Sequence, residues 1–151
     1  MGTGYFTQPS LGADRIVFVC EDDLWEVDSS GGQARRLTNS RSEIKTPYLD
    51  PSGKWIACCA KEEGDPDVYL MSADGGPLTR LTWLNSVTRI VGWTPDGSSI
   101  LFHSIHQAVH HRGSDAWLFK VGVDGGPVQR LPFGPAVSLN HQQKGSGIVL
   151  A

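Results

Sequence analysis

The sequence predicts an all-β fold made of β-propeller blades: about three four-stranded antiparallel blades and the first two strands of a fourth, in an incomplete ring. Three elements recur in the same order and support this prediction: a Pro-x-Gly turn, an Asp-x-aromatic phrase and a Gly-Gly pair. The pairs end at Gly32, Gly76 and Gly126, so successive copies are 44 and 50 residues apart. Units of about 40 to 50 residues with four short strands are typical of propeller blades.

The Gly-Gly pair and the phrases on either side of it define each repeat. A closing phrase follows every pair, namely Arg36-Leu37-Thr38, Arg80-Leu81-Thr82 and Arg130-Leu131-Pro132. An opening phrase precedes every pair, namely Asp23-Leu24-Trp25, Asp67-Val68-Tyr69 and Asp115-Ala116-Trp117. Val27, Met71 and Phe119 stand two residues after the three aromatics, and this period-two spacing indicates a strand. The three aromatics are expected to be buried between or within blades.

Tight turns precede the second strand of a repeat at Pro51-Ser52-Gly53 and Pro95-Asp96-Gly97. Proline presets φ and glycine accepts a positive φ, so each triplet favours a turn. In the second repeat, strands are therefore expected at about 46–49, 55–60, 68–72 and 78–82. The whole chain, 1–151, is interpreted as one partial propeller, with blades at about 5–40, 46–84 and 88–133 and the start of a fourth at 135–151. Recurrence of three elements in one order argues against an ordinary β-sandwich.

Composition narrows the classes of function. The net charge of −3 provides no basic stripe for nucleic acid, and no apolar run reaches the length of a membrane helix. The three cysteines are an odd number in apolar runs, which argues against a disulfide framework and for a reducing, cytoplasmic location. Adjacent Cys58 and Cys59 are expected on opposite faces of one strand. No cofactor or metal is predicted.

The third repeat is longer because of an insertion at 105–114, which contains His106, His110 and His111. Insertions in repeat proteins fall in loops on one face, which is often a binding face. No carboxylate or cysteine close by would complete a metal site, so a plain polar loop is the favoured interpretation. Whether this histidine loop binds anything is left open.

No catalytic residue is predicted. The serines mostly lie in turns, and no G-x-S-x-G elbow occurs. Asp23, Asp67 and Asp115 each begin a third strand, where a carboxylate can bond turn amides, and their repetition favours a role in the fold. Independent catalysis is therefore not expected of this chain.

Open blade faces lead to an expectation about partners. An arc of three blades leaves two apolar faces exposed, beyond the patch size that soluble monomers usually tolerate. The sequence stops within the second strand of the fourth blade, on apolar residues. We therefore expect either a second copy or the remaining blades of a longer parent chain, and favour the parent chain.

The stretch Phe18-Val19-Cys20-Glu21-Asp22-Asp23-Leu24-Trp25, with Gly31-Gly32 and Arg36-Leu37-Thr38 after it, resembles the first blade of the N-terminal six-bladed β-propeller of tricorn proteases. The resemblance spans essentially the whole chain. It implies a large cytosolic serine peptidase whose catalytic domains follow the propeller and are absent here. The propeller would act as a gate and scaffold for peptides, with the innermost strands lining a channel. Candidates for those strands are residues 46–49, 89–93 and 136–139.

Two other functions stay open. The blade phrase is shared with the TolB propeller and with prolyl-oligopeptidase propellers, so a periplasmic TolB-like binding module is one alternative. A stand-alone protein- or peptide-binding module, which could close its ring as a homodimer, is the other. A signal sequence would favour the first, a stop codon after Ala151 the second, and several hundred downstream residues with a serine nucleophile the peptidase.

Overall fold

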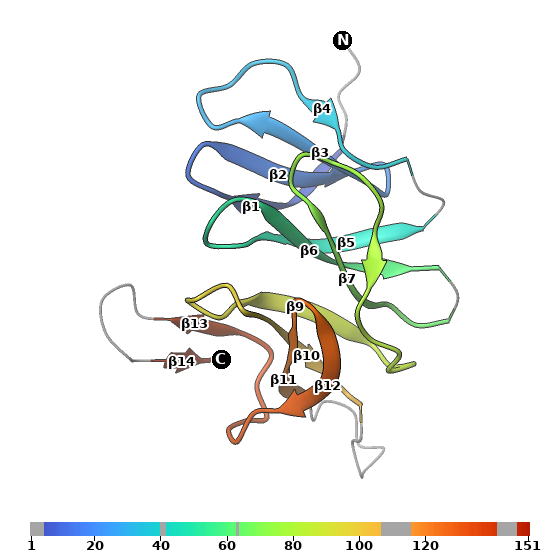
Figure 1. The fold of residues 1–151 in the computed structure, drawn as a ribbon, viewed down its shortest axis with the longest axis vertical. Helices are drawn as coiled ribbons and strands as arrows, with labels where there is room; N and C mark the ends of the chain where they lie inside the picture. The colour runs from blue at the N-terminus through green and yellow to red at the C-terminus, as the bar shows by residue number, and fades with distance from the viewer. Residues whose placement is uncertain (1–4, 40–41, 63, 107–115, 142–147) are drawn as a thin grey trace.

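The computed structural model describes residues 5–39, 42–62, 64–106, 116–141 and 148–151. Within these ranges the chain forms three four-stranded antiparallel sheets and one two-stranded sheet. The sheets follow one another in chain order from the blue end to the red end of Figure 1, and no closed ring is seen. The expected all-β fold of propeller blades is confirmed.

Each four-stranded sheet is one blade, made from four strands that are consecutive in the chain. Blade 1 consists of β1 (Phe6–Leu11), β2 (Arg15–Cys20), β3 (Asp23–Asp28) and β4 (Arg35–Arg36). Blade 2 consists of β5 (Glu43–Leu49), β6 (Trp55–Lys61), β7 (Asp67–Ser72) and β8 (Thr79–Arg80). Blade 3 consists of β9 (Thr88–Trp93), β10 (Ser99–Ser104), β11 (Trp117–Gly122) and β12 (Gly125–Arg130). β13 (Leu139–His141) pairs with β14 (Ile148–Leu150) in the two-stranded sheet.

The predicted turns form for the expected reason. Gly53 and Gly97 have φ of 72° and 70°, values that side chains strongly disfavour. The Gly53 amide donates to the Asp50 carbonyl at 3.0 Å, and the Gly97 amide donates to the Thr94 carbonyl at 2.9 Å. Each turn reverses the chain between the first two strands of its blade.

The core consists of layers between neighbouring blades. The layer between blades 1 and 2 contains Val17, Leu24 and Cys58, and the layer between blades 2 and 3 contains Cys59 and Phe102. Cys58 and Cys59 therefore do face opposite sides of β6, as predicted, and all three cysteines are free thiols. Because consecutive strand residues alternate in direction, a single blade contributes to two core layers.

The register of blade 3 corrects one alignment made from the sequence. Leu37, Leu81 and Leu131 donate equivalent backbone hydrogen bonds to Leu24, Val68 and Leu118, respectively, each at 2.8 Å. These bonds make Trp117, not Asp115, the counterpart of Asp23 and Asp67, and Phe119 the counterpart of Trp25 and Tyr69. The expected alignment was wrong by two residues, and Asp115 itself lies outside the described residues.

The distance in sequence from the aromatic residue to the Gly-Gly pair indicates the correct alignment of blade 3, whereas the Asp-x-aromatic phrase does not. Trp25 and Tyr69 stand six residues before Gly31 and Gly75, and Phe119, not Trp117, stands six before Gly125. The burial prediction fails with the alignment: Tyr69 is buried, whereas Trp25 and Trp117 are only half-buried. Trp25 is half-exposed because it lies on the open face of blade 1. Trp117 is half-exposed because it begins a strand instead of occupying its centre.

In the described part of the chain, no helix combines the length and the apolar character that crossing a lipid bilayer requires.

Candidate functional site

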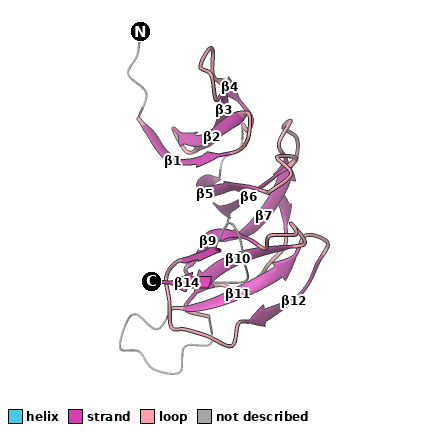
Figure 2. Cartoon of the chain, turned by 90° about the vertical axis from the view of Figure 1, so that its left-hand side faces the viewer, coloured by secondary structure: helices cyan, strands magenta, loops and turns pink. Residues whose placement is uncertain are grey.

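The innermost strands β1, β5 and β9 lie side by side and form one wall of the arc. Figure 2 shows them following one another along the same side, with β12 on the opposite side. The predicted innermost segments 46–49 and 89–93 lie in β5 and β9. In the third segment, 136–139, only Leu139 belongs to a strand, because β13 begins there.

Each innermost strand carries a local irregularity at the same place. Register shifts occur between Thr7 and Ser10 in β1 and between Lys45 and Tyr48 in β5. Gln8 and Thr46 lie in these shifts with φ of 53° and 47°, and a positive φ is a genuine outlier for a β-branched residue such as threonine. These bulges redirect the two side chains toward the neighbouring blade.

Side chains on the bulges connect the innermost strands. The Thr46 amide donates to Gln8 Oε1, and the Ile90 amide donates to Thr46 Oγ1 at 3.3 Å. Ser10 Oγ accepts a further bond at 3.1 Å from the Leu49 amide. Successive blades are therefore tied at their inner ends by polar contacts in addition to apolar packing, and the inner wall is held in one shape.

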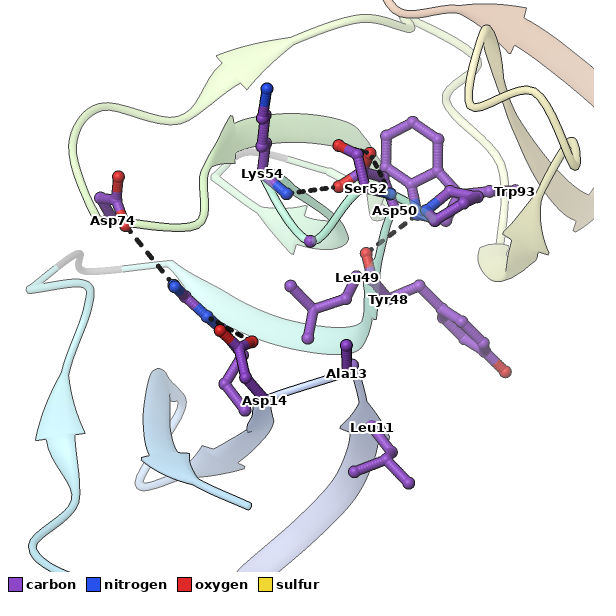
Figure 3. A pocket seen from close by; sticks show the side chains of 14 residues that line it. Leu11, Ala13, Asp14, Tyr48, Leu49, Asp50, Ser52, Lys54, Asp74 and Trp93 are labelled. Atoms are coloured by element: carbon purple, nitrogen blue, oxygen red, sulfur yellow. Dashed lines mark hydrogen bonds and ion pairs between the residues drawn. The ribbon is translucent and has the colours of Figure 1, made fainter. Parts of the chain in front are cut away.

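A cavity of about 700 Å³ lies between the turns of blades 1 and 2 (Figure 3). Leu11, Leu49 and Trp93 contribute apolar surface, and Tyr48 accepts at its carbonyl a 3.0 Å hydrogen bond from Trp93 Nε1. Asp14 and Asp74 provide carboxylates at the rim.

Asp50 fixes the blade 2 side of this cavity. Its Oδ1 accepts from the amides of Lys54 and Trp55, each at 2.8 Å, and its Oδ2 accepts from the Ser52 amide at 3.0 Å and the Ser52 hydroxyl at 2.5 Å. Burial works to raise the pKa of Asp50, but these four hydrogen bonds outweigh it and lower the pKa below its ordinary value. The carboxylate is thus fully used in holding the turn.

Arg15 clamps the two blades on the other side of the cavity. Its Nη1 lies 3.3 Å from Glu26 Oε2, 3.3 Å from the Ala73 carbonyl and 3.5 Å from Asp74 Oδ1. The residues that line the cavity include no histidine and no cysteine. The cavity has both apolar and polar lining. The side chains of Asp50 and Arg15 are already engaged in contacts that hold the turn and the two blades together.

The repeated aspartates bond side chains of the closing phrase in addition to the expected backbone amides. Asp67 Oδ1 accepts from the Thr82 hydroxyl at 2.7 Å, and its Oδ2 accepts from Arg80 at 2.5 Å. Asp23 makes the same contacts with Thr38 and Arg36. Asp67 Oδ1 also accepts a hydrogen bond from the Leu84 amide at 2.9 Å, as expected of a carboxylate at this position.

Blade 3 replaces this network by a different contact. Pro132 stands where Thr38 and Thr82 stand in the other blades, and the guanidinium of Arg130 lies over the Trp117 ring, 3.4 Å from its centroid. A cation–π contact therefore takes the place of the ion pair.

The histidine loop divides between described and undescribed residues. His106 packs edge-on against Phe119, with ring centroids 6.2 Å apart. His110 and His111 lie outside the described residues. His103 lies on β10 directly opposite Arg89 of β9. Only strand pairing brings these two residues together, so no local pattern could have identified them.

The sequence of the chain is similar to that of known proteins. Residues 3–151 match the family model described as "Tricorn protease N-terminal beta propeller domain". "Putative tricorn protease homolog 2" of Streptomyces coelicolor is 37% identical over 144 residues, which cover 89% of this chain and 12% of that protein. The chain thus spans a small part of such relatives.

Solved structures give the same picture of the fold. "Crystal structure of the tricorn protease" aligns with a TM-score of 0.79 and 27% identity, covering 93% of this chain and 14% of that one. The putative TolB from Agrobacterium tumefaciens aligns with a TM-score of 0.76 over 93% of this chain and 51% of that one, at 19% identity. At that identity the TolB likeness concerns the fold alone.

Proposed function

Because the chain belongs to the family of tricorn protease N-terminal β-propeller domains, we propose that it is the non-catalytic propeller portion of a tricorn-like cytosolic serine peptidase. Its role is that of a gate and scaffold for peptides that pass to or from a catalytic domain elsewhere in the parent protein. The match over residues 3–151 is the observation that carries this proposal.

The open face of blade 1 supports the need for further blades. Ile16 pairs with Val27 and Phe18 with Trp25, as Ile56 pairs with Met71 and Cys58 with Tyr69 in blade 2. The blade 2 residues are buried against blade 1. On blade 1 no described neighbouring blade covers the corresponding surface. Phe6 packs edge-on against Phe18 with ring centroids 5.2 Å apart and is itself 65% exposed, and an open apolar hollow of about 350 Å³ lies beside them.

This face is suited to the trailing face of another blade, which is what blade 1 itself presents to blade 2. The occupant we propose is a remaining blade of the parent chain. The innermost strands would then face a central channel, since the polar contacts between Gln8, Thr46 and Ile90 align them along one wall. Peptides in transit would meet this wall.

Reconstitution from two parts tests the proposal. The chain is mixed with the Streptomyces coelicolor relative from which the matched segment has been deleted, and the mass of the product is measured by light scattering on a sizing column. We expect a stable complex that contains both parts. Phe6→Asp should abolish it, because a charge would be buried in the new interface. Trp83→Asp is the matched control, since Trp83 is 71% exposed and does not line the hollow on that face.

A different result would favour the alternative function. A discrete homodimer that buries Phe6 and ignores the remainder of the relative would contradict the proposal. That outcome would support a stand-alone binding module that closes its ring with a second copy.

Cytoplasmic location is part of the proposal, and the free thiols support it. Cys20, Cys58 and Cys59 are buried and unpaired, as is usual in reducing compartments. Cell fractionation with an antibody against the parent protein tests this, and recovery from the periplasm would contradict it.

A further inference from the structure

Arg89 occupies an unusual position on the inner wall. It lies on β9, its side chain is exposed, and it borders two separate cavities of about 300 Å³ and 450 Å³. The smaller cavity is bounded by β5, β9, β10 and the β13 segment, and the larger by β1, β5, β6, β9 and Pro66. A ligand lying along the inner wall could contact this guanidinium from either cavity.

The charged side chains that line these two cavities are all positive. Arg89 and Lys45 are the charged residues that line the two cavities, and no carboxylate is among the described lining residues. Lys45 is partly neutralised by Glu43, whose Oε1 lies 2.5 Å from the Lys45 Nζ. The Arg89 side chain has no hydrogen bond or ion pair to a residue that the structure describes, in contrast to the side chains of Arg15, Arg35, Arg36 and Arg80.

Hydrogen-bonding groups accompany the guanidinium. His103 stands directly opposite Arg89 in the sheet, and its Nδ1 is buried with no partner among the described atoms. Thr46 borders both cavities, and Ser138 and Asn140 border the smaller one. An unpaired arginine beside an unsatisfied imidazole, with hydroxyl and amide groups nearby, favours an anionic ligand.

We infer that the surface formed by Lys45, Thr46, Arg89 and His103, the Arg89 surface, binds acidic side chains of peptides. This inference rests on the proposed function, because it names the chemistry of the peptides that pass along the inner wall. A carboxylate would accept hydrogen bonds from the guanidinium of Arg89, whose planar set of donors matches the two oxygens of a carboxylate better than a lysine ammonium does. Since side-chain carboxylates can occur anywhere in a peptide, the contact selects by composition and not by position in the peptide.

Fluorescence anisotropy with three labelled decapeptides tests the inference on the full chain. The peptides alternate glycine with glutamate, glutamine or lysine, and all carry amidated C-termini. The glutamate peptide should bind about tenfold more tightly than the glutamine peptide, a difference of about 1.4 kcal/mol. Its affinity should fall as salt rises from about 50 to 200 mM, because exposed charges are screened over a shorter distance.

Substitution locates the binding to the Arg89 surface. Arg89→Gln should weaken the glutamate peptide about fivefold and leave the glutamine peptide unchanged. Arg35→Gln is the matched control, because Arg35 is an exposed arginine on β4 that is paired with Glu26. The thermal midpoint of each variant verifies folding, and the salt dependence of the unmodified chain provides a readout that needs no variant.

Two results would overturn the inference: equal affinity for the glutamate and glutamine peptides, or no effect of Arg89→Gln on the glutamate peptide. Failure here is distinguishable from failure of the proposed function. Arg89 does not line the hollow on the open face of blade 1, so Arg89→Gln should still assemble with the truncated relative. Assembly without peptide discrimination would reject only the Arg89 surface.

Discussion

The hydroxyl of Thr82 donates to Asp67 Oδ1 at 2.7 Å and accepts from the Val68 amide at 3.0 Å. Asp67 and Thr82 are each 1% exposed, so neither can turn to water for a replacement partner. The same pair recurs in blade 1 between Asp23 and Thr38, at 2.6 Å. The two residues join the start of the third strand to the end of the fourth.

Thr82→Val should lower the free energy of unfolding by about 1–3 kcal/mol, because it leaves the buried Val68 amide unsatisfied and removes one of the two hydrogen bonds to Asp67 Oδ1. Urea denaturation followed by tryptophan fluorescence measures the change. Thr79→Val is the matched control on β8, the strand just before Thr82; Thr79 is exposed, and its substitution should change stability by under about 0.5 kcal/mol. Equal effects of the two substitutions would show that the network contributes little.

The register of blade 3 is testable by rebuilding the network of the other blades. Trp117→Asp and Pro132→Thr together should place an aspartate, a threonine and Arg130 as in blade 2. We expect each single substitution to destabilise, and the pair to lose less than the sum by about 1–2 kcal/mol. A double-mutant cycle in urea gives this coupling. Additive effects would mean that Trp117 is not the counterpart of Asp67.

Trp117→Ala by itself should cost about 2–3 kcal/mol, less than the 3–5 kcal/mol typical of a fully buried tryptophan. The ring is half-buried between Arg130 and Gly134, whose ideal Cβ would stand 3.2 Å from the ring. Tyr69→Ala provides the comparison, because Tyr69 is 2% exposed and should cost more. A larger loss at Trp117 than at Tyr69 would contradict the revised register.

The free energy of unfolding should fall as the pH is lowered below about 6.5, the ordinary pKa of histidine. Burial, followed by the positive charge of Arg89, lowers the pKa of His103 from 6.5. The unfolded chain therefore binds its proton at higher pH than the native chain does, and this contribution to stability is lost as pH falls below about 6.5. Urea midpoints between pH 5 and 8 measure the slope.

His103→Val should flatten that slope, since Val19 occupies the corresponding position in blade 1. Arg89→Gln should flatten it in part, because the repulsive charge is removed while burial remains. An unchanged slope in His103→Val would assign the pH dependence to other groups.

Cys58 and Cys59 should resist thiol reagents in the native chain. Burial raises the pKa of both thiols, that of Cys59 to about 11, and the thiolate is the reactive form. Mass spectrometry after treatment with iodoacetamide at pH 8 should show these residues unmodified until urea unfolds the chain. Rapid native labelling would mean that β6 opens readily.

Constraints that act between residues close in sequence allow much of the fold to be predicted from the sequence. Turns form at Gly53 and Gly97 because glycine adopts the positive φ that each chain reversal requires. Cys58 and Cys59 face opposite core layers because the side chains of consecutive strand residues alternate in direction. Such constraints act over a few residues, so the blade count, the strand positions in blade 2 and the turns could all be predicted.

Tertiary structure decided the rest. The phrase Asp115-Ala116-Trp117 copied the local pattern of the other blades, but backbone pairing between Leu118 and Leu131 placed Trp117 in the aspartate position. Arg89 and His103 form one surface only because β9 pairs with β10, and Arg15 reaches Asp74 only because blades 1 and 2 pack together. Register and packing between blades depend on which distant apolar faces become buried together, and no short segment contains that information.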